Sequence, residues 1–280
     1  MTPLNLLLGA MLATMIAASA YRRGSLDFSG AIGAVLVGTL VFAGGGLAGG
    51  LLLVAFFVTS SALSHYHART KEPLAEKFQK GSRRDLGQVL ANGGWSAFLA
   101  LMFGFIPQPI FFFALAGAMA TVNADTWATE LGVLSKEPPR LITNGQVVAI
   151  GTSGAITRLG TLVALCGALL IGILGFATTA ASALFPTWFY PVRGAAFLIP
   201  IAGVSGLLGS LFDSLLGSTV QAIYYCDFDQ KETESARHRC GRETRLVRGW
   251  RWLDNDWVNL FASVVGSAIA ATLYWVIQPI

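Results

Sequence analysis

The hydrophobic positions of this chain fall into long continuous runs separated by short polar connections. A bilayer core about 30 Å thick is crossed by about 20 apolar residues in a helix, and runs of that length recur along the whole chain. The pattern predicts an all-α fold, a polytopic transmembrane helical bundle of about eight spans, in a single integral membrane domain over residues 1–280. The predicted spans are 4–21, 28–44, 47–65, 86–105, 109–134, 154–181, 193–225 and 256–277.

Two of these runs each leave an alternative open. The first ends in Ala18-Ser19-Ala20, which resembles a signal-peptide cleavage site, but no Lys or Arg precedes it and Arg22 and Arg23 follow it directly. That order favours a retained helix with its N-terminus outside. The segment 193–225 would be about 50 Å long as one helix, which is too long for a straight crossing. Either its glycines break it, or it extends into the cytoplasm.

The composition excludes several classes of protein. Hydrophobic residues make up 54% of the chain and charged residues 12%, whereas a soluble chain carries about 25% charged residues. Together with a mean hydropathy of +0.62, this excludes a soluble enzyme. Three cysteines are too few for a disulfide scaffold. The 32 glycines suit membrane helices whose backbones approach one another closely.

The basic residues are concentrated on alternate connections. Four connections contain 17 of the 19 Lys and Arg residues, and the turns between them contain none. By the positive-inside rule the basic connections are cytoplasmic, which places both termini outside. This alternation supports a count of eight spans. The basic connections are residues 22–23, 66–85, 135–153 and 226–253.

Three carboxylates lie inside two predicted spans, all toward the cytoplasmic side: Asp125, Glu130 and Asp213. Burying an ionised carboxylate without compensation is prohibitive, and the spans offer few basic partners. Hard oxygen ligands of this kind suit a divalent cation. We therefore predict that all three bind Mg²⁺ and that, with Asn92, they are the catalytic residues. The alternative for the neighbouring Asn, Gln and Ser residues is that they only join helices by hydrogen bonds.

Candidate hydrogen-bond donors to phosphate lie at the same depth in the membrane as the three carboxylates. Mg²⁺ is usually held by one or two carboxylates together with substrate phosphates. The string Gly151-Thr152-Ser153-Gly154 is predicted to open a helix, where backbone N–H groups bind anions; its alternative is a flexible turn with a Ser or Thr cap. The candidate substrate- or phosphate-binding residues are Lys80, Arg83, Arg84, Gln88, Asn123, Thr152, Ser153, Gly154, Ser214, Gln221 and Asn259.

The long basic connection 226–253 also contains Cys226, His238 and Cys240. These residues are scattered and do not have the spacing of a zinc motif, so no metal is expected there. Trp250 and Trp252 indicate that the chain returns to the membrane interface. We interpret the connection as an interfacial cytoplasmic loop that contacts anionic lipid or nucleotide.

Five strings follow one another in order over nearly the whole chain: RDLGQVLANGG (84–94), NADTWATELGVLS (123–135), GTSGAIT (151–157), GSLFDSLLGSTVQ (209–221) and DNDWVNL (254–260). Together they resemble one family of membrane proteins, which includes chloroplast and cyanobacterial phytyl-phosphate kinase and eukaryotic transmembrane protein 19. The chain departs from the family pattern at Ser153-Gly154-Ala155, where Asn-Gly-Gly is expected, and this weakens the assignment of a phosphate loop.

The resemblance implies that a nucleoside triphosphate, with CTP as one candidate, phosphorylates an isoprenoid monophosphate to its diphosphate. It also implies a distant similarity to CDP-lipid synthases, which makes nucleotidyl transfer an alternative. A membrane transporter and a purely structural membrane protein are the alternatives from other classes. The expected partners are an isoprenoid lipid phosphate, a nucleotide and membrane lipid, with no nucleic acid; the sequence does not specify an oligomeric state.

Overall fold

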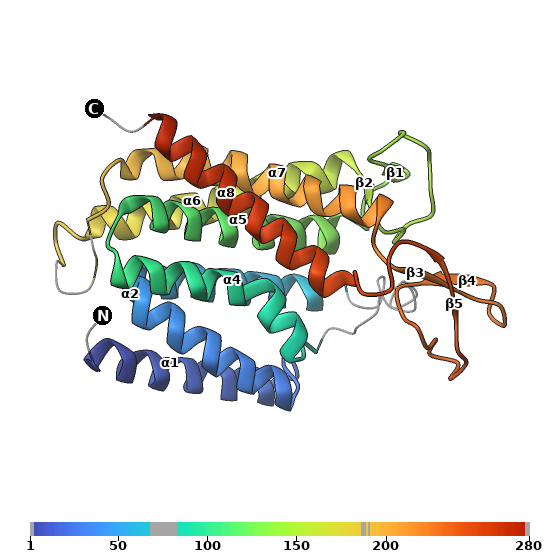
Figure 1. Ribbon diagram of the computed structural model, residues 1–280, viewed down its shortest axis with the longest axis horizontal. Helices are drawn as coiled ribbons and strands as arrows, with labels where there is room; N and C mark the ends of the chain where they lie inside the picture. Colours follow the sequence, from blue (N-terminus) through green and yellow to red (C-terminus); the bar gives the residue numbers. More distant parts are fainter. Residues whose placement is uncertain (1–2, 68–82, 186–188, 190, 278–280) are drawn as a thin grey trace.

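The apolar runs form long helices that lie side by side in one elongated bundle (Figure 1). The computed structural model describes residues 3–67, 83–185, 189 and 191–277. Seven helices in this described part are long and apolar enough to cross a membrane. The predicted fold class, a polytopic helical membrane bundle, is confirmed. The helices are α1 (Pro3–Arg22), α2 (Phe28–His65), α4 (Leu86–Phe105), α5 (Pro109–Gly132), α6 (Arg158–Ala181), α7 (Leu198–Thr219) and α8 (Asn255–Ile277), with a short 3₁₀ turn, η2 (Ala195–Phe197), before α7.

Helix α2 reverses its direction at Gly46. This residue has φ 61° and ψ −161° inside an otherwise helical stretch, a conformation that is essentially restricted to glycine. Near the end of the second arm, Ser61 accepts a hydrogen bond of 3.2 Å from Arg84. Arg84 in turn accepts one of 3.1 Å from the backbone N–H of Asp27, just before the first arm. The two ends of α2 therefore lie together, and its antiparallel arms correspond to the predicted spans 28–44 and 47–65.

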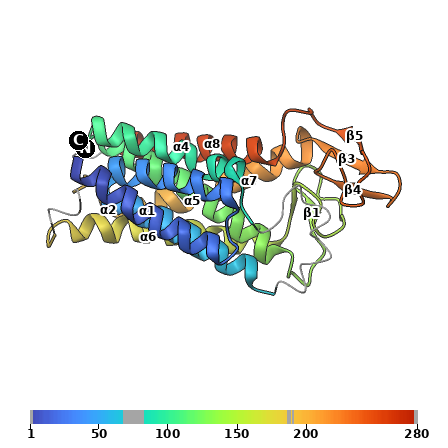
Figure 2. The same ribbon diagram turned by 90° about the horizontal axis from the view of Figure 1, so that it is seen from below.

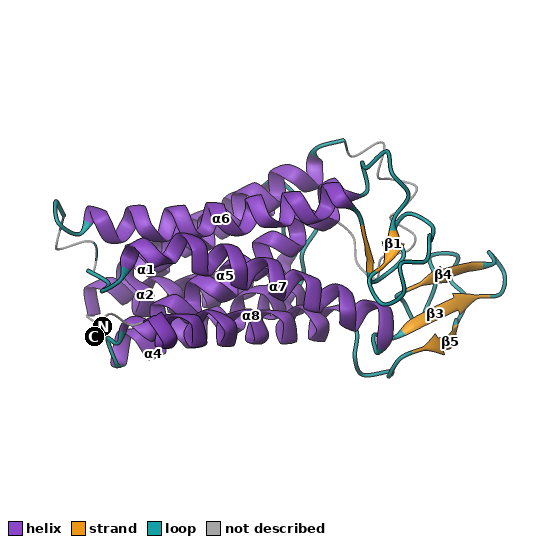
Figure 3. Ribbon diagram, turned by 90° about the horizontal axis from the view of Figure 1, so that it is seen from above, coloured by secondary structure: helices purple, strands orange, loops and turns teal. Residues whose placement is uncertain are grey.

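Helix α5 occupies the centre of the bundle (Figures 2 and 3). It contacts α2, α4, α6, α7 and α8, whereas α1 packs on α2 at the periphery. Most of α5 from Phe112 to Ala124 is buried. A helix that is apolar on all sides over this length belongs in the interior, and its polar residues after Ala124 then have to face other protein groups or a cavity.

The connections are sorted between the two ends of the bundle. Both termini lie at one end, and every strand lies at the other (Figures 1 and 3). The basic connections that the structure describes are at the end with the strands; residues 68–82 of the connection 66–85 fall outside the described residues. This arrangement agrees with the sorting of charge along the sequence, while the side of the membrane on which each end lies stays a prediction.

Two connections contain short strands that the all-α prediction did not include. They lie beyond the apolar runs; β5, for example, alternates between exposed and partly buried residues, as a strand with one covered face does. One pair is antiparallel, and the other sheet has the order β4-β3-β5 with antiparallel neighbours. The strands are β1 (Arg140–Leu141), β2 (Ala155–Ile156), β3 (Ile223–Cys226), β4 (Lys231–Thr233) and β5 (Arg245–Arg248).

Two predicted boundaries are wrong. The segment 193–225 is neither broken at a glycine nor continuous, because α7 ends at Thr219 and β3 begins at Ile223. The string at 151–154 does not open a helix, because β2 intervenes and α6 begins at Arg158. The side chain of Thr157 caps α6 by accepting a 2.9 Å hydrogen bond from the N–H of Gly160. The first turn of α6 is thus capped by a protein side chain.

Candidate functional site

A cavity of about 700 Å³ opens at the end of the bundle that carries the strands. It is bounded by the ends of α2, α5 and α7, by the beginnings of α4, α6 and α8, and by the connections between them. The structure therefore brings together polar residues from five strings that are far apart in sequence. Of the residues predicted for the site, those that line the cavity are Arg84, Gln88, Asn92, Asp125, Glu130, Thr152, Ser153, Gly154, Asp213, Ser214, Gln221 and Asn259.

One side of the cavity, here called the acidic wall, consists of Asp125, Asp213 and Glu234. Ser210 on α7 donates a 3.4 Å hydrogen bond to Oδ1 of Asp125 on α5. The Oδ2 atom of Asp213 is buried and has no hydrogen-bond partner among the described residues. The charge of Asp213 is repelled by those of Asp125 and Glu234. The acidic wall therefore concentrates negative charge that a cation would stabilise.

A second group of cavity residues, here called the paired wall, consists of Ser64, Arg84 and Glu130. Ser64 on α2 donates a 2.6 Å hydrogen bond to Oε1 of Glu130. Arg84 lies over the rings of Phe56 and Phe57, 5.7 and 5.5 Å from their centroids. Burial lowers the pKa of Arg84, and the charge of Glu130 opposes that shift by favouring the protonated guanidinium. The Glu130 carboxylate is thus already engaged by protein groups.

The polar residues at the beginning of α4 serve the helix as well as the cavity. Asp85 accepts a hydrogen bond of 2.9 Å from the N–H of Gln88, whose side chain accepts one of 3.2 Å from the N–H of Asp85. This capping box satisfies two N–H groups at the start of the helix. Asn92 donates a 2.9 Å hydrogen bond to the carbonyl of Gln88. The predicted stripe on α4 therefore combines a structural function with its position in the cavity wall.

The glycine-rich turn before α6 packs directly on the end of α7. Gly154 has φ +78°, and a Cβ atom there would collide with the backbone of Ser214 and Ser218. Ser153 donates a 2.8 Å hydrogen bond to Oε1 of Gln221, and Nε2 of Gln221 donates one of 3.0 Å to Glu234. Gln221 is 1% exposed. Although it was predicted to bind substrate, its amide connects the turn to the three-stranded sheet.

Two predicted residues do not line the cavity, and a third lies outside the described residues. Asn123 is buried; it accepts a hydrogen bond of 3.1 Å from Thr59 and donates one of 2.8 Å to the carbonyl of Gly167. It therefore joins α2, α5 and α6. Arg83 is exposed beside Asp27, whose pKa is lowered mainly by the N–H of Gly30 and to a smaller extent by Arg83. Lys80 lies outside the described residues.

Glu234 and Arg239 are among the cavity residues that the sequence prediction missed. Both lie in the connection between β4 and β5. The signal was absent because charged residues in a polar connection carry no periodicity that distinguishes a cavity-lining side chain from a solvated one. Only the pairing of β3 with its neighbours places these two residues beside the helices.

The cation predicted for three carboxylates fits the pair Asp125 and Asp213 better than all three. Among the described residues, a compact group of three or more potential ligand atoms occurs elsewhere, in the three-stranded sheet. Asp125, Glu130 and Asp213 line one cavity without forming such a group. The buried and unpartnered oxygen of Asp213, close enough to Asp125 for repulsion, is the observation that fits a divalent cation.

The fold and the cavity define a polytopic membrane protein with a polar, acidic site at one end of its bundle. Residues 11–267 match the family described as integral membrane protein DUF92, and the chain belongs to this family. Protein PGR of Arabidopsis thaliana is 33% identical, over 95% of each chain. An uncharacterized membrane protein of Methanocaldococcus jannaschii is 30% identical, over 98% of this chain and 96% of its own.

Protein VTE6, chloroplastic, of Arabidopsis thaliana is 27% identical, over 88% of this chain and 64% of its own. The family to which the five strings pointed is therefore confirmed. No solved structure matches the chain.

Proposed function

We propose that this protein is a membrane phosphotransferase that converts an isoprenoid monophosphate to its diphosphate, with a nucleoside triphosphate and Mg²⁺ as co-substrates. The observation that carries the proposal is the buried, unpartnered carboxylate oxygen of Asp213 beside Asp125 in the cavity. Membership of the family supports the choice of an isoprenoid phosphate, because the resemblance includes phytyl-phosphate kinase. When bound at Asp125 and Asp213, Mg²⁺ would neutralise charge on the substrate phosphates.

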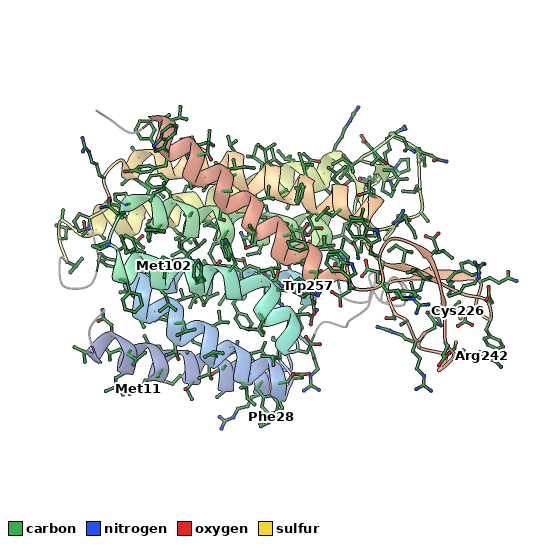
Figure 4. All side chains as sticks on the ribbon, in the orientation of Figure 1. Met11, Phe28, Met102, Cys226, Arg242 and Trp257 are labelled. Atoms are coloured by element: carbon green, nitrogen blue, oxygen red, sulfur yellow. The ribbon has the colours of Figure 1, made fainter. Side chains whose placement is uncertain are left out.

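The position of the cavity suits a lipid acceptor and a soluble donor. It lies where the helices end, so it is accessible to a lipid phosphate from the headgroup level and to a nucleotide from the aqueous side. The rings of Trp250 and Trp252 stack with centroids 5.7 Å apart, and the ring of Trp252 meets that of Trp257 at 6.4 Å. Figure 4 shows Trp257 near the start of α8. Exposed tryptophans of this kind are enriched at the membrane interface. The prenyl chain would lie along the apolar helices, so long-chain monophosphates should be better substrates than water-soluble ones.

The chemistry requires charge compensation more than a base. A phosphate monoester has a second pKa of about 6, so the acceptor is already a nucleophile at neutral pH. One of its oxygens would bond to the γ-phosphorus while the bond to the β,γ-bridging oxygen breaks and a nucleoside diphosphate leaves. Phosphoryl transfer depends mainly on positioning and charge stabilisation. Arg84 and Arg239 would hold phosphate oxygens, and Asn92, Ser214 and Asn259 would orient them.

The structure removes one argument for a transporter. Transporters place their site near the midplane, often between broken helices, and the long segment 193–225 was the feature that favoured such a break. Helix α7 is continuous over its 22 residues. The cavity also lies at one end of the bundle.

The test supplies purified protein with a prenyl monophosphate, Mg²⁺ and each nucleoside triphosphate labelled at the γ-phosphate, and resolves the lipid products. Labelled prenyl diphosphate is the expected result. A free prenyl alcohol should be a poor acceptor, because its hydroxyl is protonated and no general base has been assigned to it. Incorporation of the nucleoside would instead establish nucleotidyl transfer. Absence of lipid labelling with all four nucleotides, together with substrate flux in proteoliposomes, would establish transport.

A further inference from the structure

The three-stranded sheet contains a second cluster of chemistry-bearing side chains that the proposed reaction does not use. Cys226 ends β3, Asp229 lies in the turn to β4, and His238 and Cys240 lie in the hairpin before β5. Each offers one potential ligand atom, and these four atoms lie within 4.8 Å of one another. The expectation that the cysteines and histidine of this connection are scattered is therefore wrong, because the antiparallel strands bring the two turns together (Figure 4).

The donor types and the sulfur separation fit a tetrahedral metal. Two thiols, an imidazole and a carboxylate are ligands that Zn²⁺ accepts. The Sγ atoms of Cys226 and Cys240 are 3.7 Å apart. Two thiolates bound to one tetrahedral Zn²⁺ at about 2.3 Å each are separated by about 3.8 Å, whereas a disulfide requires about 2.05 Å. The two thiols thus stand at the separation of thiolates that share a metal.

The histidine supplies an independent observation. His238 is 4% exposed, and its Nδ1 atom lies 2.8 Å from Oδ2 of Asp229. Its Nε2 atom is buried and has no hydrogen-bond partner among the described residues. The Nδ1 atom also accepts a 3.5 Å hydrogen bond from the backbone N–H of Cys240, so this nitrogen faces the other potential ligands. A metal accounts for an imidazole buried between a carboxylate and two thiols, since the group becomes a ligand and its neighbours orient it.

We propose that Cys226, Asp229, His238 and Cys240 bind one structural Zn²⁺ ion. The metal would join the β3–β4 turn to the hairpin that precedes β5. A three-stranded sheet this small has little core of its own, and structural metals commonly stabilise such units. In the sequence, Arg239 stands between the ligands His238 and Cys240, and its side chain lines the cavity. The metal would therefore hold Arg239 in place, although its own binding does not depend on the proposed reaction.

The experiment measures metal content in the full-length protein purified in detergent. The protein is incubated with Zn²⁺, freed of unbound metal, and analysed by mass spectrometry for zinc per chain. About one zinc per chain is expected for the wild type, and less than about a fifth of that for C226S and H238N. The matched control is C166S, which changes the exposed cysteine of α6 and should keep the wild-type stoichiometry.

A second measurement keeps the test decisive if the ligand variants do not fold. Co²⁺ exchanged into the wild-type protein should give the thiolate charge-transfer and tetrahedral d–d absorption bands of a site with sulfur ligands. A wild-type protein that retains no zinc after incubation would overturn the proposal. So would intact-mass detection of a Cys226–Cys240 disulfide, or a folded C226S variant with undiminished zinc.

Discussion

The two walls of the cavity manage buried charge in opposite ways. On the paired wall, Glu130 accepts a hydrogen bond from Ser64 and lies near the cation of Arg84. On the acidic wall, Asp213 has a buried oxygen without a partner in the described part of the chain and is repelled by Asp125 and Glu234. Proteins tolerate unfavourable charge mainly where function requires it. The charges of the paired wall are thus compensated within the protein, whereas the acidic wall keeps a charge that the proposed Mg²⁺ would compensate.

The largest effect should follow from neutralising the acidic wall. The variants D125N and D213N should each lower turnover by about 10²–10³-fold, because the amide keeps the shape but loses the charge that would hold Mg²⁺. In EDTA, D213N should also raise the melting temperature by about 2–4 °C, because it removes repulsion. Turnover is measured in the labelling assay and melting in detergent. Turnover within tenfold of wild type would break the comparison between the two walls.

A smaller and opposite effect on stability is expected on the paired wall. The variant E130Q leaves Arg84 without its compensating charge, so the melting temperature should fall and turnover should drop by about tenfold. A double-mutant cycle of E130Q with R84M should give a coupling free energy of about 1 kcal/mol. A coupling free energy indistinguishable from zero would show that these two residues do not act as a pair.

The turn that closes the cavity can be tested with two glycines that share a backbone conformation. G154A should destabilise the protein by about 1–3 kcal/mol more than G145A. Both positions have positive φ, at +78° and +70°, but only at Gly154 would a Cβ atom meet the backbone of α7. The difference between their melting temperatures therefore isolates the packing of the turn. Equal destabilisation would mean that the turn does not rest on α7.

The smallest effect is expected for a carboxylate that belongs to neither wall. Asp227 is 70% exposed and pairs with Arg245 at 3.1 Å on the surface of the sheet. The variant D227N should lower the free energy of unfolding by less than about 1 kcal/mol, because exposed ion pairs usually contribute no more than that. Turnover should be unchanged. A large loss of turnover would show that the sensitivity to Asp→Asn changes is general and not a property of the acidic wall.

The helical part of the site could be predicted because the position of a residue along its span gives its depth in the membrane, and its spacing from other polar residues gives the helix face that they share. The charges of the connections indicate which half of each span is nearer the cytoplasm. They therefore place four polar residues at a common depth: Asn92, Asp125, Asp213 and Asn259. Which face each residue presents depends on packing, however. Asn123 is two positions from Asp125 and faces α2 and α6, not the cavity. Hydrophobicity does not distinguish the two in a helix surrounded by protein on all sides.

The part of the site outside the helices could not be predicted, for a different reason. Gln221 and Glu234 meet only because β3 and β4 pair, and such pairing depends on contacts between residues far apart in the sequence. The same pairing unites Cys226 with Cys240, which spacing alone did not connect. Short strands in a polar connection lack the long apolar runs from which the membrane spans could be predicted.

The reversal at Gly46 determines whether the two termini lie at the same end of the bundle or at opposite ends. When α2 is counted as one helix, the described part contains seven helices that could cross a membrane. Seven crossings are an odd number, which would place the two termini at opposite ends of the bundle. One residue with a positive φ turns the 38-residue α2 into an out-and-back pair, and both termini then lie at the same end of the bundle (Figure 1). Without this reversal, every helix after α2 would run in the opposite direction relative to α1, so the relative placement of the two termini depends on one glycine at the end of the bundle remote from the cavity.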